Sequence, residues 1–188
     1  MAASIYGCVN LKQKLLFSQL VSEESYFYKY SQLLKDKFSR QRIVSIVTTH
    51  PYSYSDASTK RDPIAVLAKA KSNSYFDPNF EINWLSMYKA SASYQNSSEV
   101  NFISGLKTFL QAMQYSQFEN DVVIDSEETS IKASRVYLMS RDLKDSQEEG
   151  KFMLEARENA DASEFKCFAY SPFFISFEQF IQILTQTL

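Results

Sequence analysis

Few side chains in this sequence are suited to catalysis or to metal binding. His50 is the only histidine, so a three-histidine zinc site, an HExxH helix or a Cys/His finger cannot be assembled. As a general base, His50 would stand just before Pro51 at a strand end, with no nucleophile or orienting carboxylate at a known spacing. The sequence therefore predicts no catalytic residue, no metal ligand and no enzymatic activity.

Glycine and acidic residues are equally uninformative about chemistry. The familiar nucleotide-binding loops and the GxSxG elbow require closely spaced glycines, and this chain has only three, far apart: Gly7, Gly105 and Gly150. Acidic pairs at 127–128 and 148–149 could suggest calcium binding, but the first falls in a predicted turn and the second at a predicted helix N-terminus. We therefore expect no cofactor and interpret both pairs as solvated or capping residues.

Asn96 is the one candidate modification site. Asn96, Ser97 and Ser98 form an N-glycosylation sequon in a polar stretch between two predicted helices. The two cysteines, Cys8 and Cys167, are too few for a disulfide framework, although one bridge is arithmetically possible. We expect them to stay apart, because Cys8 precedes the first helix whereas Cys167 lies inside the last strand.

The composition is that of a globular domain. Apolar residues make up 45% of the chain and aromatic residues 15%, and the net charge is −2 with scattered lysines and arginines, so a nucleic-acid partner is not expected. No stretch of about 18 apolar residues is present, which predicts that the chain as given is soluble. The aromatic residues could line a lipid-binding groove, but helical spacing favours a core position for most of them: Tyr26, Tyr30, Phe102, Phe109, Phe173 and Phe174.

Hydrophobic periodicity predicts four helices outside the middle of the chain. They cover residues 22–38, 98–115, 146–162 and 173–188. Ser22 is the expected N-cap of the first helix, and the sequence SQEE, residues 146–149, is the expected capping box of the third. The apolar face of helix 98–115 should comprise Phe102, Ile103, Leu106, Phe109, Leu110 and Met113. The corresponding faces of the first, third and last helices are Tyr26, Tyr30, Leu33, Leu34 and Phe38; Phe152, Met153, Ala156 and Ala160; and Ile175, Phe177, Ile181, Leu184 and Leu188.

Runs rich in β-branched and aromatic residues predict four strands. They cover residues 42–49, 121–125, 130–140 and 165–170, and the middle two form a hairpin. One face of the long strand should carry Ile131, Ala133, Tyr137 and Met139. Residues 56–95 contain two short helical patterns, one opened by Asp62 and Pro63 and carrying Ile64, Leu67 and Ala68, the other carrying Ile82, Leu85 and Tyr88 around Trp84. We interpret this stretch as a helical insertion.

The order of these elements predicts the fold. Without the insertion and the terminal helices it reads strand, helix, strand, strand, helix, strand, which is typical of a ferredoxin-like split βαβ unit. We therefore expect an α+β fold formed by residues 1–188 as a single domain, with a helical insertion and flanking N- and C-terminal helices. This topology requires the strand at 130–140 to lie beside the strand at 42–49.

Several stretches, in order, resemble one protein family. They are IYGCVNLKQKLLFSQLVSEESYFYKYSQLLKDKFS at 5–39, NWLSMYKA, FISGLKTFLQA, NDVVIDSEETSIKASRVYL at 120–138, LEARENADAS and FAYSPFFISFEQF at 168–180. Together they resemble the second large ectodomain of patched-related proteins, which belong to the resistance-nodulation-division superfamily and have sterol-sensing membrane domains. The sequence SRQRIV at 39–44 departs from that pattern, because relatives tend to place a glycine there.

The resemblance implies a non-catalytic extracellular or luminal domain of a patched-like transporter or receptor. Its expected partners are the companion ectodomain and the transmembrane bundle of the same full-length protein, with which it would form a conduit or binding surface for sterol or another lipid. The transmembrane helices are absent from this chain, which is then an excised domain, a truncated product or an incomplete gene model. The alternative is a free-standing soluble interaction module that binds protein or peptide along an edge strand.

Overall fold

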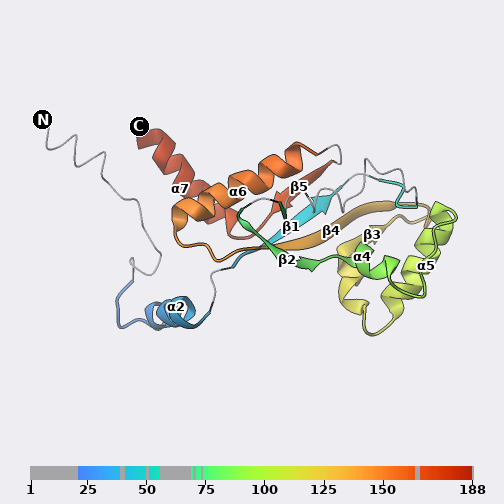
Figure 1. Cartoon of the computed structure of the whole chain (residues 1–188), viewed down its shortest axis with the longest axis horizontal. Coiled ribbons are helices and arrows are strands. Elements are labelled where there is room, and N and C mark those ends of the chain that lie inside the picture. The colour runs from blue at the N-terminus through green and yellow to red at the C-terminus, as the bar shows by residue number, and fades with distance from the viewer. Residues whose placement is uncertain are drawn as a thin grey trace, which may run out of the picture.

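The computed structural model describes residues 21–38, 41–49, 51–55, 69, 71–72, 74–163 and 166–187 (Figure 1). Helices and strands are interspersed along the chain, and the protein has an α+β fold. In chain order the elements are α2 (Tyr26–Lys37), β1 (Ile43–Thr48), β2 (Phe76–Ile82), α4 (Trp84–Lys89), α5 (Glu99–Gln111), the 3-10 helix η2 (Ser116–Asp121), β3 (Val122–Ile124), β4 (Ile131–Ser140), α6 (Ser146–Asp161), β5 (Cys167–Tyr170) and α7 (Phe174–Thr187).

All strand pairs in the sheet are antiparallel. The strand order is β2-β4-β1-β5, and β3 pairs with β4. With β2 set aside, the order β5-β1-β4-β3 is that of the ferredoxin-like split βαβ unit, so the predicted fold class is confirmed. The predicted neighbours do pair: Ile43 lies opposite Met139 and Thr48 opposite Ser134.

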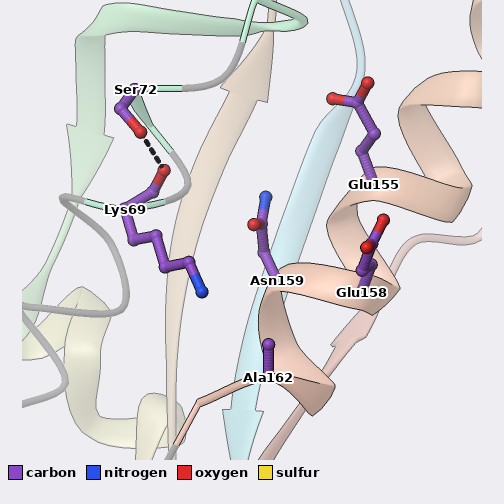
Figure 2. A pocket seen from close by; sticks show the side chains of 6 residues that line it. All are labelled: Lys69, Ser72, Glu155, Glu158, Asn159 and Ala162. Atoms are coloured by element: carbon purple, nitrogen blue, oxygen red, sulfur yellow. Dashed lines mark hydrogen bonds between the residues drawn. The ribbon is translucent and has the colours of Figure 1, made fainter.

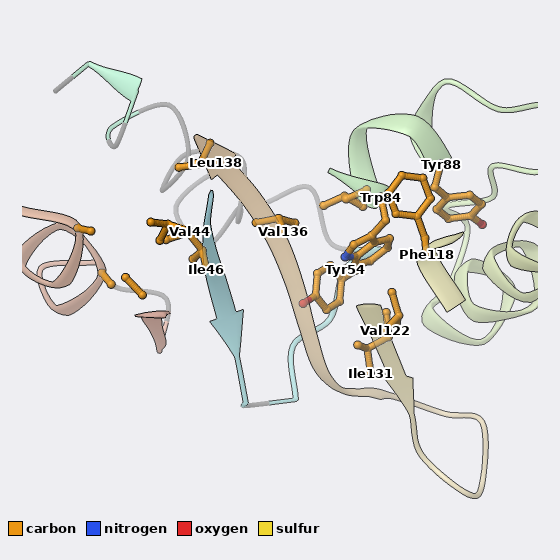
Figure 3. Packing of buried hydrophobic residues seen from close by; sticks show 14 of the residues in the cluster. Val44, Ile46, Tyr54, Trp84, Tyr88, Phe118, Val122, Ile131, Val136 and Leu138 are labelled. Atoms are coloured by element: carbon orange, nitrogen blue, oxygen red, sulfur yellow. The ribbon is translucent and has the colours of Figure 1, made fainter. Parts of the chain in front are cut away.

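Successive side chains of β1 and β4 point to opposite faces of the sheet, and one of these faces is turned toward the helices. Val44 and Ile46 of β1 are buried, as are Val136 and Leu138 of β4 (Figure 3). Because Val44 pairs with Leu138 and Ile46 with Val136, these four side chains share one face of the sheet. That face packs against α6 through ring contacts such as Phe76 with Phe152, whose centroids are 5.0 Å apart.

Of the four residues predicted to share one face of β4, Ala133, Tyr137 and Met139 do so, but Ile131 does not. Val123 lies opposite Ala133 but Ile124 lies opposite Ile131, so β4 carries one extra residue at this point. Such a bulge reverses the alternation of side chains. Ile131 therefore shares the buried face, whereas Tyr137 and Met139 lie on the opposite face, which the sequence had not distinguished from the core.

Beside the sheet, α4, α5 and η2 form an aromatic core. Tyr88 contacts the rings of Phe102 and Phe109 at 5.0 and 5.4 Å between centroids. The predicted buried face of α5 is confirmed for Phe102, Ile103, Leu106, Phe109 and Leu110. Met113, in contrast, is 93% exposed, because α5 ends at Gln111 and the backbone of Ala112 is extended (ψ 128°).

The end of the chain follows the predicted pattern with two corrections. Phe152, Met153, Ala156 and Ala160 of α6 are buried, as predicted. The N-cap is Asp145, not Ser146: Asp145 Oδ1 accepts from the backbone N–H groups of Gln147 and Glu148, each at 3.1 Å. In α7, Phe177 is buried but Ile175 is 63% exposed.

The first helix starts later than predicted, and its apolar side is exposed. Its N-cap is Ser25, whose Oγ accepts from Tyr28 N at 3.1 Å, whereas Ser22 Oγ accepts from Glu24 N. Tyr26 and Tyr30, expected to be core residues, are 88% and 51% exposed. The prediction that they are internal is therefore wrong.

The insertion is not wholly helical. Residues 76–82 form β2, which includes Ile82, and the helix begins only at Trp84 after the N-cap Asn83. Pro78 is tolerated in β2 because this strand lies at the edge of the sheet and pairs irregularly with β4. The helix predicted from Asp62 and Pro63 lies outside the described residues.

Phe109 provides a test of the core assignment. Phe109→Ala should lower the free energy of unfolding by about 3–5 kcal/mol, because Phe109 is 1% exposed and its removal leaves a cavity among Tyr88, Tyr115 and Phe118. Met113→Ala, just past the end of the same helix, should change it by less than about 0.5 kcal/mol. Urea denaturation followed by circular dichroism measures both. Equal losses for the two variants would show that α5 is oriented differently.

Candidate functional site

Of the residues singled out in the sequence, the structure describes Asn96, in the loop before α5, and Cys167, in β5. Asn96 is exposed in the loop before α5. The two serines of its sequon are both hydrogen-bonded to Asn101, Ser97 Oγ through the amide Nδ2 at 2.8 Å and Ser98 Oγ through the backbone N–H at 3.2 Å. His50 and Cys8 lie outside the described residues. Asn96 therefore remains a sterically accessible modification site.

Cys167 is a free thiol at the start of β5. Its Sγ lies 3.4 Å from Ser163 Oγ and 3.7 Å from the carbonyl oxygen of Ala160. Burial raises the pKa of the Cys167 thiol, which lowers its thiolate fraction and hence its reactivity. These contacts fit a packing role for Cys167.

Among the described residues, no group of three or more His, Cys, Asp or Glu side chains could hold a metal ion. The acidic pairs are engaged elsewhere. Glu128 pairs with Lys107 at 2.6 Å, Glu149 with Arg42 at 3.2 Å, and Glu148 Oε2 accepts from Lys144 N at 2.9 Å. Glu128 and Glu148 thus fit the solvated and capping roles interpreted from the sequence, whereas the solvated role is wrong for Glu149, which is only 6% exposed beside Arg42.

A shallow cavity of about 470 Å³ lies between α6 and the residues preceding β2 (Figure 2). Among the described residues its lining is five polar side chains and one alanine: Lys69, Ser72, Glu155, Glu158, Asn159 and Ala162. Pockets for sterols and similar ligands are lined mainly by apolar side chains. This cavity is therefore unsuited to a lipid ligand.

Another candidate surface is the face of the sheet opposite α6, which we call the open face. Residues that lie opposite one another on neighbouring strands form rows across this face. The rows are Ile43 with Met139; Tyr170 with Ser45, Tyr137 and Ile82; Phe168 with Val47 and Arg135; and Val123 with Ala133. Five large apolar side chains on it are 37–52% exposed: Ile43, Ile82, Val123, Phe168 and Tyr170. Antiparallel sheets commonly leave one face to solvent, but that face is then mostly polar.

One charged group is held rigidly on the open face. Arg135 Nε donates to Asp121 Oδ1 at 2.5 Å, and the Tyr137 hydroxyl donates to the same oxygen at 2.7 Å. The guanidinium carbon lies 5.5 Å from the centroid of the Tyr137 ring, within the range of a cation–π contact. The Asp121 side chain is only 6% exposed, so a buried carboxylate fixes an exposed guanidinium.

The pKa values of Tyr137 and Arg135 are both raised in this arrangement. Burial, followed by the hydrogen bond to Asp121, raises the pKa of Tyr137 to about 12. The hydrogen bond with Asp121 also raises the pKa of Arg135. The Tyr137 phenol is thus neutral and Arg135 is charged at physiological pH. The Arg135 side chain is 44% exposed, and a guanidinium is a strong donor to a carboxylate.

The open face has the features of a binding surface. Contiguous exposed apolar area on a folded domain commonly marks an interaction site, and an aromatic and Arg-containing composition is typical of interface residues. Sequence reasoning placed Tyr137 and Met139 on one face of the strand but did not assign that face to solvent, so it missed this surface. The signal available in the sequence was Arg135, which stands at the same alternate positions as Tyr137 and Met139 and marks that face as solvent-directed.

No protein-family model matches the chain. In the part of the chain that the structure describes, every helix falls short of the length and hydrophobicity needed to cross a membrane.

The Asp121 contact can be tested by titration. Asp121→Asn should lower the pKa of Tyr137 from about 12 toward the ordinary value of 10.0, because the phenolate no longer faces a carboxylate. Asp125→Asn, in the β3–β4 turn, changes a carboxylate that hydrogen-bonds Thr129 and Ser130 instead, and should leave Tyr137 unchanged. NMR titration of ¹³Cζ-labelled tyrosine, with the Tyr137 signal assigned from Tyr137→Phe, measures the shift. An unchanged pKa in Asp121→Asn would contradict this geometry.

Proposed function

We propose that this chain is the second large ectodomain of a patched-related membrane transporter and that it acts by binding, without catalysis. The observation that carries the proposal is the open face, with its exposed aromatic and aliphatic rows around a fixed guanidinium. The two stretches that most resemble the family both contribute to it: residues 120–138 contain Asp121, Arg135 and Tyr137, and residues 168–180 begin with Phe168.

In this proposal the open face docks the companion ectodomain of the same full-length protein. Its apolar rows supply the area that leaves water on binding. Arg135 selects a carboxylate on the partner and fixes the orientation of the two domains, because charged contacts at an interface contribute specificity more than affinity. Sterol or another lipid would then move along a wall completed by both ectodomains and the transmembrane bundle, in keeping with the polar character of the cavity beside α6.

The alternative function is a free-standing module that binds a peptide along an edge strand. It is favoured by β5, which lies at the edge of the sheet and pairs with β1 alone in the strand order. Such binding uses backbone hydrogen bonds at the edge, whereas the proposed docking uses side chains of the open face. Substitutions on that face therefore discriminate between the two functions.

Tyr170→Lys should weaken binding of the purified companion ectodomain by about tenfold or more. The substitution removes apolar contact in the row of Tyr137, and the new charge must lose its hydration when the partner binds. Val100→Lys is the matched control, since Val100 is 58% exposed on α5, outside the open face. Isothermal titration calorimetry measures both, with circular dichroism to verify folding. Equal affinity of the two variants would remove the open face as the docking surface.

The proposed topology places Asn96 on the extracellular or luminal side. The full-length protein expressed in eukaryotic cells should show a glycosidase-sensitive mass shift that Asn96→Gln abolishes. Ser98→Thr should retain it, because threonine preserves both the sequon and the N-cap of α5. Labelling of this domain by a cytosol-restricted reagent would contradict the assignment.

A further inference from the structure

Helix α2 carries an apolar stripe that stays exposed in the described part of the chain. Six large side chains at helical spacing are 37–88% exposed: Tyr26, Phe27, Tyr30, Leu33, Leu34 and Phe38. A helix of 12 residues is marginal in water by itself and normally depends on packing of its apolar side. The stripe therefore requires a partner surface.

The open face matches α2 in size. The 12 residues of α2 make a rod about 18 Å long, and the six residues of β1 extend about 20 Å. Both surfaces are apolar and rich in aromatic side chains. In the view of Figure 1, α2 lies apart from the sheet, beyond the strand ends at which β1 begins and away from α6.

The connection between the two surfaces has a suitable length. Helix α2 ends at Lys37 and β1 begins at Ile43, so residues 38–42 join them, within the usual 2–6 residues of a helix-to-strand loop. Ile43 is itself part of the open face. A helix turned back along β1 would place Leu33 near the row of Tyr170 and Tyr30 near the row of Phe168.

From these observations we propose that α2 is a strap that closes over the open face of its own sheet, giving a third layer. Resting on the function proposed above, this closure makes α2 an internal competitor of the companion ectodomain, which binds by displacing it. The short tether favours the chain's own helix over that of another copy, because it holds α2 at a high effective concentration.

Disulfide trapping in the isolated chain tests the closure without any partner. In a background of Cys8→Ser and Cys167→Ser, the pair Leu33→Cys with Tyr170→Cys should form an intramolecular disulfide on mild oxidation. A second pair, Tyr30→Cys with Phe168→Cys, detects closure in which the helix is shifted along the strands so that the first pair does not meet. The control pair, Leu33→Cys with Val100→Cys, should stay reduced. Mass spectrometry and non-reducing electrophoresis distinguish monomeric from dimeric products.

Several outcomes would overturn the strap. Disulfide-linked dimers from either test pair would assign the open face to a second copy, and free thiols in both pairs would show that α2 does not reach it. Equal trapping in the control pair would show only unspecific collisions of α2.

A binding measurement separates this inference from the proposed function. Tyr30→Glu with Leu33→Glu should tighten companion binding, by about tenfold if nine in ten molecules are closed. Trapping without any companion binding would retain the strap and reject the proposed docking. Companion binding that is indifferent to the two α2 substitutions, together with absent trapping, would retain the docking and reject the strap.

Discussion

The pairing of β1 with β4 is the interaction on which the other features of this protein depend. Hydrogen bonds between buried hydroxyl groups fix the register of this pair. Thr48 Oγ1 lies 2.9 Å from Ser134 Oγ, and the Tyr54 hydroxyl lies 3.0 Å from the same Ser134 atom. Buried polar groups are costly when they lack a partner. Any other register would separate Thr48 from Ser134, so this cluster penalises slippage that hydrophobic contacts alone would tolerate.

This register divides the sheet into two faces with different tasks. A shift by one residue would exchange the face of every side chain on a strand. With the register fixed, Val44 and Leu138 stabilise the fold against α6, while the opposite side chains, Tyr137 and Met139 among them, are available for contact. Substitutions on the open face should therefore leave the core intact, so the docking proposed for that face can be tested separately from folding.

Asp121 links the two faces. It follows Phe118, which is buried in the aromatic core beside α5, and precedes β3, and its carboxylate reaches the open face to hold Arg135 and Tyr137. The position of the guanidinium thus depends on the packing of η2 in the core. A charge fixed by the core provides orientation at an interface more effectively than one on a free side chain, because less side-chain entropy is lost on binding.

The sequence by itself determined the order of elements, the ferredoxin-like fold and the buried faces of α5 and α6, since these follow from local periodicity of apolar residues. It could not determine which side of β4 is buried, because the extra residue in the bulge opposite β3 exists only once the two strands pair. Periodicity likewise marked Tyr26, Tyr30 and Met113 as apolar-face residues without showing whether a partner surface lies against them. The sequence did not identify the open face for the same reason. A helical or alternating pattern identifies a side that can be buried, and only tertiary packing decides whether another element covers it.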